Sequence, residues 1–237
     1  MYGFESHVSI PIVRPGGELF AQLIGAQLDV EDRLEKSEGA QVLERSVTEP
    51  QQQRVVRNIQ RSTGRMTEMI TNVLDFARGR LGVGIPVALY SDRTLAEDLH
   101  HVIDEVKSTH PEHVIEVDLQ IDGPVVCDRS RISQLLSNLL ANAVIHGAAD
   151  RPVRIAAKLA CGQFELSVSN GGDPIPAEKI TRLFQPFSRS TDSAPRPGLG
   201  LGLYIAAEIA KAHGGTLDVQ SSASAGTRFV FRMPLKK

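Results

Sequence analysis

The longest regular hydrophobic pattern in the second half of the chain is helical. Between residues 128 and 145, apolar side chains recur at intervals of three and four with polar residues between them, which predicts a long amphipathic helix. Its core-facing positions are expected to be Ile132, Leu135, Leu136, Leu139, Leu140 and Ala143. A second helix is predicted from about Leu203, and it ends at His213-Gly214-Gly215, a common helix-end signal.

Shorter segments around these two helices have the apolar pattern of strands. The expected strands are 114–119, 153–159, 164–168, 216–220 and 227–233, and further helices are expected at 94–108 and just before Leu183. Helices and strands mixed in this way, without strict alternation, are typical of a two-layer α+β sandwich. We therefore expect an α+β domain over residues 87–237.

The N-terminal part of the chain has a different pattern. Alternating apolar residues, a turn at 14–17 and an apolar run to Leu28 predict a β-hairpin over residues 1–28. Helices are predicted at 30–47 and 51–80, and the second carries an apolar stripe typical of a coiled coil or helix bundle. The stripe consists of Val55, Ile59, Met66, Met69, Val73 and Phe76. Residues 29–86 are thus predicted to form a helical hairpin that dimerises, with a glycine-rich linker at its end.

Composition and charge narrow the classes of function. The chain of 237 residues is 41% hydrophobic and 23% charged, and its formal net charge of -2 argues against a nucleic-acid-binding surface. It contains no apolar run long enough to span a bilayer and no signal peptide, so we expect a cytoplasmic protein without membrane insertion. The cysteines Cys127 and Cys161 lack metal-ligand spacing and are expected to be buried free thiols.

Three segments carry candidate chemistry. Gly198, Gly200 and Gly202 directly precede the second helix, and such a run either cradles a phosphate group or is a flexible turn before a buried helix. Asn138 and Asn142 lie one turn apart on one helix face, where their amides are able to bind Mg²⁺ or to hydrogen-bond a neighbouring loop. The turn that begins at Asn170 is able to place a polar side chain against a base edge, although turn chemistry alone also explains its composition.

These segments occur in the order found in sensor histidine kinases, whose ATP-binding domain is related to that of type II topoisomerase. The stretch from Asn138 to Ala143 resembles the N-box of the family, and NGGDPI at 170–175 resembles its first glycine box. LFQPF at 183–187 resembles the phenylalanine box, and GLGLGLYIA at 198–206 resembles the second glycine box. Four motifs in the right order make the chain similar to a histidine kinase core over about residues 40–237.

Two further segments resemble other parts of such kinases. NVLDFARGRLG at 72–82 resembles the end of the second helix of the dimerisation hairpin. Residues 1–28 resemble the closing part of a GAF sensor domain. The resemblance thus implies a partial GAF-like hairpin at 1–28, a dimerisation hairpin with its linker at 29–86, and an ATP-binding catalytic domain at 87–237.

The resemblance implies a site for ATP and Mg²⁺. By it, Asn142 binds Mg²⁺ with Asn138 beside it, and Asn170 faces the adenine amino group. Residues 188–199 form a mobile lid over ATP, with Phe184 and Phe187 as packing anchors. The implied nucleotide contacts are Asn138, Asn142, His146, Asn170, Gly172, Ile175, Gly198, Leu199, Gly200, Leu201, Gly202 and Thr227.

The chain also departs from the family pattern. Asn170 replaces the usual aspartate, so its amide oxygen accepts a hydrogen bond without a full negative charge, and Ile145 stands where many relatives have a basic residue. The family carries a phosphoacceptor histidine in the first hairpin helix, whereas no histidine lies between His7 and His100. His7 itself belongs to an extended pattern, so we expect that the acceptor segment is missing, as a deletion near residues 25–40 would explain.

The sequence therefore predicts a histidine kinase core. Such a core passes the γ-phosphoryl group of ATP to a histidine and then to the receiver domain of a response regulator. We expect that this chain does not autophosphorylate, and no catalytic acceptor residue is assigned. The missing acceptor leaves open a rival hypothesis, a nucleotide-gated dimerisation or interaction module without kinase output. A Ser/Thr kinase of the anti-sigma type fits less well because it leaves the long helical hairpin unexplained.

Overall fold

The computed structural model describes residues 50–188 and 199–235, and the chain divides into two compact units, Met1–Thr71 and Asn72–Lys237. The β-hairpin predicted at 1–28, the helix predicted at 30–47 and most of the predicted lid with Gly198 lie outside the described residues. Helix α3 (Pro50–Arg80) confirms the helix predicted at 51–80, and its last residues, from Asn72, belong to the second unit. Among the helices described, none is long and apolar enough to cross a membrane.

The apolar stripe of α3 is open to solvent in the single chain. Its first five residues each expose about half of their surface: Val55, Ile59, Met66, Met69 and Val73. The sixth, Phe76, is partly buried and packs against the core of the second unit. An exposed stripe of this kind is the surface that a partner helix would cover, so dimerisation through it stays a prediction.

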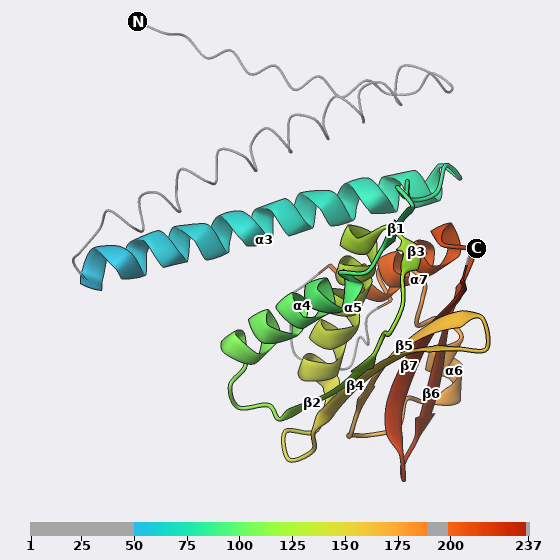
Figure 1. The fold of residues 1–237 in the computed structure, drawn as a ribbon. Helices are drawn as coiled ribbons and strands as arrows, with labels where there is room; N and C mark the ends of the chain where they lie inside the picture. The colour runs from blue at the N-terminus through green and yellow to red at the C-terminus, as the bar shows by residue number, and fades with distance from the viewer. Residues whose placement is uncertain (1–49, 189–198, 236–237) are drawn as a thin grey trace, which may run out of the picture. The chain divides into compact units, whose positions relative to one another are not determined.

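A mixed five-stranded sheet forms one layer of the second unit (Figure 1). Its strands, in spatial order, are β2 (Ile115–Gln120), β4 (Val153–Ala160), β5 (Gln163–Asn170), β7 (Gly226–Pro234) and β6 (Thr216–Ser222). The β2–β4 pair is parallel, and the other three pairs are antiparallel. All five strands were expected from the hydrophobic pattern, with bounds within a few residues of those observed.

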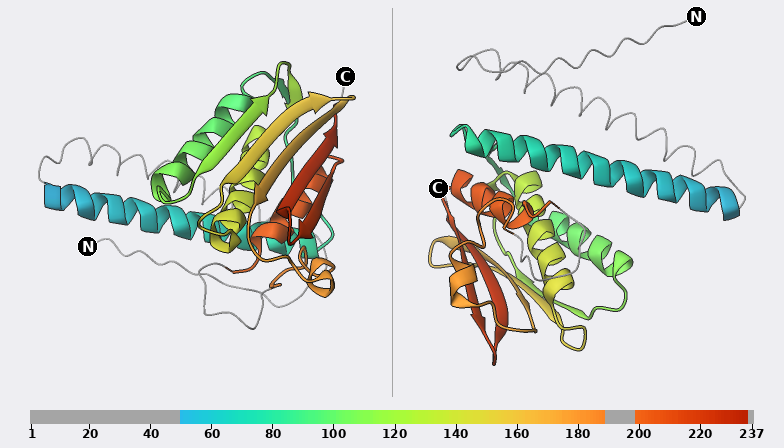
Figure 2. Two further views of the ribbon diagram at one scale, coloured as in Figure 1. Left: turned by 90° about the horizontal axis from the view of Figure 1, so that it is seen from below. Right: turned by 180° about the vertical axis from the view of Figure 1, so that it is seen from behind.

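Helices form the second layer and cover one face of this sheet (Figures 1 and 2). They are α4 (Leu95–Thr109), α5 (Arg129–His146) and α7 (Gly202–Ala212), and a short helix α6 (Ala177–Ile180) lies between β5 and α7 in sequence. A small antiparallel pair, β1 (Tyr90–Asp92) with β3 (Val125–Cys127), was not expected. Strands of three residues are too short to show a period of two. The two layers confirm the α+β sandwich.

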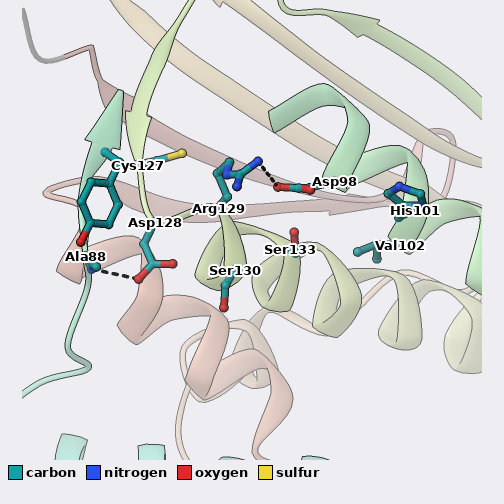
Figure 3. Close-up of a pocket in the computed structure, with 10 residues that line it drawn as sticks. Ala88, Asp98, His101, Val102, Cys127, Asp128, Arg129, Ser130 and Ser133 are labelled. Atoms are coloured by element: carbon teal, nitrogen blue, oxygen red, sulfur yellow. Dashed lines mark hydrogen bonds and ion pairs between the residues drawn. The ribbon is translucent and has the colours of Figure 1, made fainter. Parts of the chain in front are cut away.

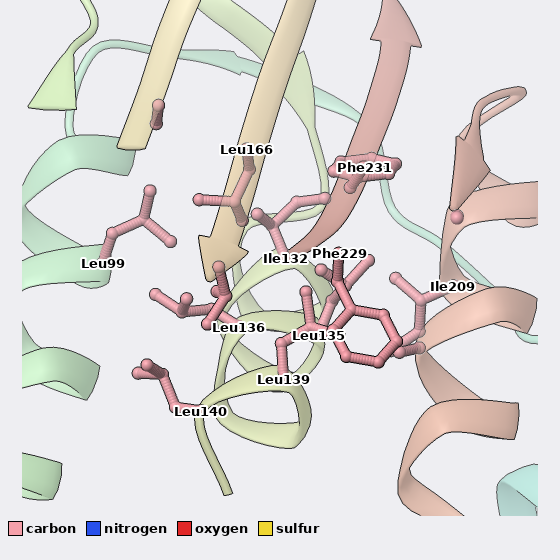
Figure 4. Packing of buried hydrophobic residues seen from close by; sticks show 14 of the residues in the cluster. Leu99, Ile132, Leu135, Leu136, Leu139, Leu140, Leu166, Ile209, Phe229 and Phe231 are labelled. Atoms are coloured by element: carbon pink, nitrogen blue, oxygen red, sulfur yellow. The ribbon is translucent and has the colours of Figure 1, made fainter. Parts of the chain in front are cut away.

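The core lies between the layers, with α5 at its centre (Figure 4). All six core positions predicted for α5, from Ile132 to Ala143, have an exposed fraction of 0%. They pack with apolar side chains from the other helices and the strands, including Leu99, Leu166, Ile209, Phe229 and Phe231. Each large apolar side chain buried in this way contributes about 1.5–3 kcal/mol. This packing fixes the position of the polar side chains on the other faces of α5.

The opposite face of the sheet carries charged residues in ion pairs. Arg154 on β4 pairs with Glu116 on β2 at 2.6 Å, and Arg232 on β7 pairs with Glu165 on β5 at 2.8 Å. Alternate residues of a strand point to opposite faces, so one face packs on the helices while the other keeps charges in water.

The two cysteines differ from each other, and the prediction of two buried thiols is wrong for one of them. Both are free; Cys127 is buried as expected, but Cys161 is exposed. Cys161 and Gly162 form the turn between β4 and β5, where their φ angles are +52° and +73°. Positive φ at both central residues is the pattern of a type I′ two-residue hairpin turn, and such a turn lies at the surface whatever its side chains.

Candidate functional site

Helix α5 carries the first part of the site on its C-terminal half. Asn138 and Asn142 are half-buried and lie one turn apart, as predicted. The Nδ2 atom of Asn138 is buried and has no hydrogen-bond partner within the described residues. A buried polar atom without a partner is rare in native proteins, and it indicates that a ligand or water completes the site.

The first turn of α7 lies close to Asn138. A Cβ atom added at Gly202 would come within 2.9 Å of the Oδ1 atom of Asn138, so only glycine permits this approach without displacing the amide. Before it, Gly200 has a φ of +70°, and the backbone N–H of Phe187 donates to the carbonyl of Gly200 at 3.1 Å. The second glycine box therefore brings α7 next to the asparagine face of α5.

The N-terminus of α7 has no side-chain cap. Leu201 stands at the N-cap position, where its side chain is buried and makes no hydrogen bond to the helix. The first backbone N–H groups of a helix have no intrahelical acceptor and carry the positive end of the helix dipole. This helix end is therefore suited to an anion such as a phosphate group.

A second unpaired polar atom lies at the end of β5. Asn170 is 6% exposed, and its Nδ2 donates to the carbonyl of Gly171 at 2.9 Å. Its Oδ1 is buried and has no partner within the described part of the chain. The bond to Gly171 fixes the amide so that the free atom is an acceptor, which would take a hydrogen bond from an amino group.

The turn after Asn170 docks on the end of α5. The backbone N–H of Ala148 donates to the carbonyl of Gly171 at 2.9 Å. Gly172 has a φ of +134°, and a Cβ atom there would lie 3.1 Å from the carbonyl oxygen of His146. His146 is exposed beside this turn. Glycine at position 172 thus permits a close approach of the turn to the backbone of α5.

Ser221 links two further residues of the predicted set and was missed by sequence reasoning. Its hydroxyl accepts from the backbone N–H of Ile175 at 2.9 Å and lies 2.8 Å from the hydroxyl of Thr227. Thr227 is buried and pairs with Asn170 across β7 and β5. A β6 serine carries no motif signal, because its role depends on the pairing of β6 with β7.

The structure brings predicted residues together at two places along α5: Gly202 meets Asn138, and the turn that contains Asn170 and Gly172 meets the C-terminal end of the helix. Asn138, Asn142 and His146 come from α5, and Asn170, Gly172, Ile175 and Thr227 come from the neighbouring strand ends and turn. Leu199, Gly200, Leu201 and Gly202 precede or begin α7. The side chain of Leu201 faces the core, so this residue offers only its backbone to a ligand. Phe184 packs against Phe229, whereas Phe187 is 58% exposed.

A metal ion in this site would depend on amide oxygens. Among residues 50–188 and 199–235, no group of three or more His, Cys, Asp or Glu side chains is placed to hold a metal. Asparagine carbonyl oxygens are hard neutral ligands that suit Mg²⁺, an ion that keeps waters and phosphate oxygens as its other ligands. The residues present therefore fit Mg²⁺ that arrives with a nucleotide, and they do not form a cage for a free ion.

A separate hollow lies at the other end of α5, beside its N-terminus (Figure 3). Its charged groups have partners: Arg129 pairs with Asp98 at 3.2 Å, and Asp128 accepts from the N–H of Ala88 at 2.9 Å and of Arg131 at 3.2 Å. These bonds join α4 and the chain at Ala88 to the N-terminal end of α5. The hollow contains none of the predicted nucleotide contacts.

Comparison with known proteins identifies the domain type. Residues 127–237 match the family described as histidine kinase-, DNA gyrase B-, and HSP90-like ATPase. The chain is 32% identical to a bacteriophytochrome of Pseudomonas aeruginosa over 182 residues, which is 76% of this chain and 25% of that protein. It is 34% identical to the sensor histidine kinase AruS of the same organism over 179 residues, which is 70% of this chain and 18% of that protein.

Solved structures are similar in fold to this chain, among them a histidine kinase catalytic domain. Full-length ShkA in complex with AMPPNP has a TM-score of 0.64 and 26% identity, with 92% of this chain and 46% of that chain covered. The catalytic domain of the histidine kinase ThkA has a TM-score of 0.53 and 27% identity, with 65% of this chain and 100% of that chain covered. The chain spans a quarter or less of the two curated relatives described above.

Proposed function

We propose that the chain carries the ATPase core of a sensor histidine kinase, and that this core binds ATP with Mg²⁺ and transfers the γ-phosphoryl group to a histidine. The observation that carries the proposal is the pair of buried amide atoms without partners, Nδ2 of Asn138 and Oδ1 of Asn170. They lie on separate elements, α5 and β5, and Asn138 lies beside the uncapped N-terminus of α7, which supports the proposal. A nucleotide offers partners for each of these groups.

In this proposal Asn170 forms a hydrogen bond with the adenine base. Its free Oδ1 accepts a hydrogen bond from the amino group of adenine, while guanine would present a second acceptor at that position. The amide is neutral, so the bond lacks the extra strength of a charged acceptor. In exchange, the site buries no carboxylate when the nucleotide is absent, which avoids a large desolvation cost.

Asn142 and Asn138 hold Mg²⁺ with the phosphates, and the backbone of Gly200–Gly202 with the start of α7 contacts the phosphate oxygens. When bound, the ion neutralises charge that develops on the transferred phosphoryl group. The protein contributes position: α5 is fixed by its buried face, and Gly202 lets α7 approach Asn138. His146, Ile175, Leu199 and Thr227 complete the nucleotide contacts.

We propose that the acceptor histidine is supplied in trans, by another molecule. The described part of the hairpin, α3, contains no histidine. The exposed stripe of α3 supports dimerisation with a second copy, and a receiver domain of a response regulator is the expected final phosphate acceptor.

The proposal is tested by nucleotide binding to the full chain. Titration with Mg-AMPPNP and with metal-free AMPPNP is expected to show binding that Mg²⁺ strengthens. Asn142→Ala should remove the Mg²⁺-dependent part, about tenfold in Kd for the loss of one ligand of about 1.4 kcal/mol. Asn58→Ala on the exposed surface of α3 is the matched control and should bind like the wild type. Equal affinity with and without Mg²⁺ would remove the metal assignment.

A second measurement separates a kinase from a nucleotide-gated module. The chain is incubated with labelled Mg-ATP, alone and with a histidine-containing hairpin from a close relative. We expect acid-labile, base-stable label on the added hairpin only. Binding without label on any hairpin would favour the module, and label on the chain alone before Leu89 would contradict the missing acceptor.

A further inference from the structure

We propose that the end of α3 positions the nucleotide site from outside it. In this inference Asp75, Phe76 and Gly79, which we call the docking segment, hold the supports of the second glycine box and thereby raise the affinity for Mg-nucleotide. The inference rests on the proposed function. None of these residues lies in the four sequence boxes, and none is placed to touch a nucleotide.

Asp75 anchors the docking segment to α5. Its carboxylate is 1% exposed and accepts from Arg131 at 2.7 Å and from Gln134 at 3.1 Å, and Arg131 also donates to Gln134 at 2.8 Å. The three side chains form a closed set in which the buried negative charge has both an ionic and a neutral partner. Loss of either partner would leave the buried carboxylate of Asp75 incompletely compensated, which costs free energy. These bonds therefore favour the docked position of α3.

Phe76 contacts one residue before the second glycine box, Phe187, and one residue within it, Tyr204. Its ring lies 5.0 Å from that of Phe187 and 5.9 Å from that of Tyr204, measured between centroids, and both pairs meet edge to face. Phe187 donates its backbone N–H to Gly200, and Tyr204 follows Gly202 in the first turn of α7. One side chain of α3 therefore touches the support of Gly200 and the helix that Gly202 begins.

Phe187 needs such support. Its φ of +58° lies in the left-handed region, which costs conformational free energy in a phenylalanine. The described structure offsets this cost with the bond to Gly200 and with the contact to Phe76. Without Phe76, the backbone at Phe187 would be free to leave the left-handed conformation. Its hydrogen bond to the carbonyl of Gly200 would then be weakened.

Gly79 completes the contact on the side of Tyr204. A Cβ atom at Gly79 would overlap the hydroxyl of Tyr204, so any other residue here would displace either the Tyr204 ring or the end of α3. Burial raises the pKa of the Tyr204 phenol, and the nearby Glu208 raises it further, so the hydroxyl keeps its proton at neutral pH. Gly64 lies in the same helix, but a Cβ atom there would meet nothing within 4 Å.

These contacts couple docking to nucleotide binding. A nucleotide must order the backbone from Gly200 to Gly202, and docking supplies part of that order in advance. Because coupling between two equilibria is reciprocal, nucleotide must in turn stabilise the docked segment. We therefore expect substitutions in the docking segment to raise the Kd for nucleotide, and nucleotide to slow hydrogen exchange at the end of α3.

The experiment measures both quantities on the full chain with Mg-AMPPNP as the probe. Gly79→Ala and Asp75→Asn are expected to raise Kd at least about fivefold, the lower end of typical couplings. Gly64→Ala makes the same change in helix propensity without a clash, and Glu116→Gln removes a carboxylate from an exposed ion pair; both should bind within twofold of the wild type. Adding Tyr204→Phe to Gly79→Ala removes the overlapping hydroxyl and should restore part of the affinity.

Hydrogen exchange of the wild type gives the reciprocal measurement without any variant. Amides of Leu81, Gly82 and Val83, which donate to the end of α3, should exchange more slowly with Mg-AMPPNP than without it. Wild-type binding with unchanged affinity in both docking variants, or unchanged exchange at these amides, would overturn the inference alone. Failure of the wild type to bind Mg-AMPPNP would remove the proposed function and this inference with it.

Discussion

The two ends of α5 differ in whether their polar groups have hydrogen-bond partners. At the N-terminal end, Asp128 accepts from two backbone N–H groups, and its own N–H donates to Nε2 of His213 at 3.1 Å. Arg131 and Gln134 there share the carboxylate of Asp75. At the C-terminal end, Asn138 and the neighbouring Asn170 each keep a buried amide atom without a partner in the described residues.

This difference separates two kinds of site. The N-terminal end of α5, with Asp128, Arg131, Gln134 and their partners, is a structural joint, and the C-terminal end is the proposed ligand site. A buried polar atom left without a partner costs about 1–3 kcal/mol, so a fold retains one where a ligand regains the loss. Charge is a poor guide here, because the joint holds the charged residues and the site holds neutral amides. The satisfied end of α5 fixes the helix, and the unsatisfied end is where we propose that a nucleotide binds.

The largest expected effect of a substitution is at the joint. His213 is 2% exposed; its Nδ1 lies 2.8 Å from the carbonyl of Ile209, and its Nε2 accepts from Asp128, so a neutral ring with the proton on Nδ1 satisfies both bonds. His213→Leu leaves the N–H of Asp128 without its acceptor and removes one of the two bonds to the Ile209 carbonyl, which still accepts the backbone N–H of residue 213 at 3.2 Å. We expect the free energy of unfolding to fall by about 1–3 kcal/mol. Urea denaturation measures this.

The exposed His101 provides the control for that experiment, since His101→Leu should change the free energy of unfolding by less than about 0.5 kcal/mol. A loss below about 1 kcal/mol for His213→Leu would show that the joint relaxes around the missing ring, and the contrast between the two ends would weaken.

A smaller effect is expected at the helix cap. Asp128→Ala removes the acceptor for the N–H groups of Arg131 and Ala88 but leaves its own backbone bond to His213. Loss of an N-cap costs about 0.5–2 kcal/mol, so we expect a lower melting temperature with nucleotide affinity nearly unchanged. Calorimetry with and without Mg-AMPPNP measures both; a tenfold loss of affinity would show that the cap itself, and not only the contact of Asp75, is coupled to the nucleotide site.

The sequence predicted the ligand end of α5 better than the joint. The buried face of α5 follows from local periodicity, and the boxes follow from residues that lie near one another in the chain, so Asn138, Asn142 and Asn170 could be found. The ion pair of Asp75 with Arg131 joins positions 56 residues apart, and neither residue has a local pattern that indicates its partner. The position of Cys161 in a hairpin turn and the bond of Ser221 depend likewise on strand pairing that the sequence alone did not specify.

The smallest expected change in stability has the opposite sign and lies at the ligand end. Asn138→Leu replaces a buried amide that lacks a partner by an apolar side chain of similar size. Because no bond of Nδ2 is lost within the described chain, we expect the nucleotide-free protein to be equally stable or more stable, by up to about 1 kcal/mol. Mg-AMPPNP should then raise the melting temperature less than it does in the wild type, because one contact of the proposed site is lost. Thermal denaturation of both proteins, with and without Mg-AMPPNP, gives the four values required. A destabilised Asn138→Leu protein that gains as much stability from Mg-AMPPNP as the wild type would mean that Asn138 is part of the core, and that the amide atoms without partners do not mark the site.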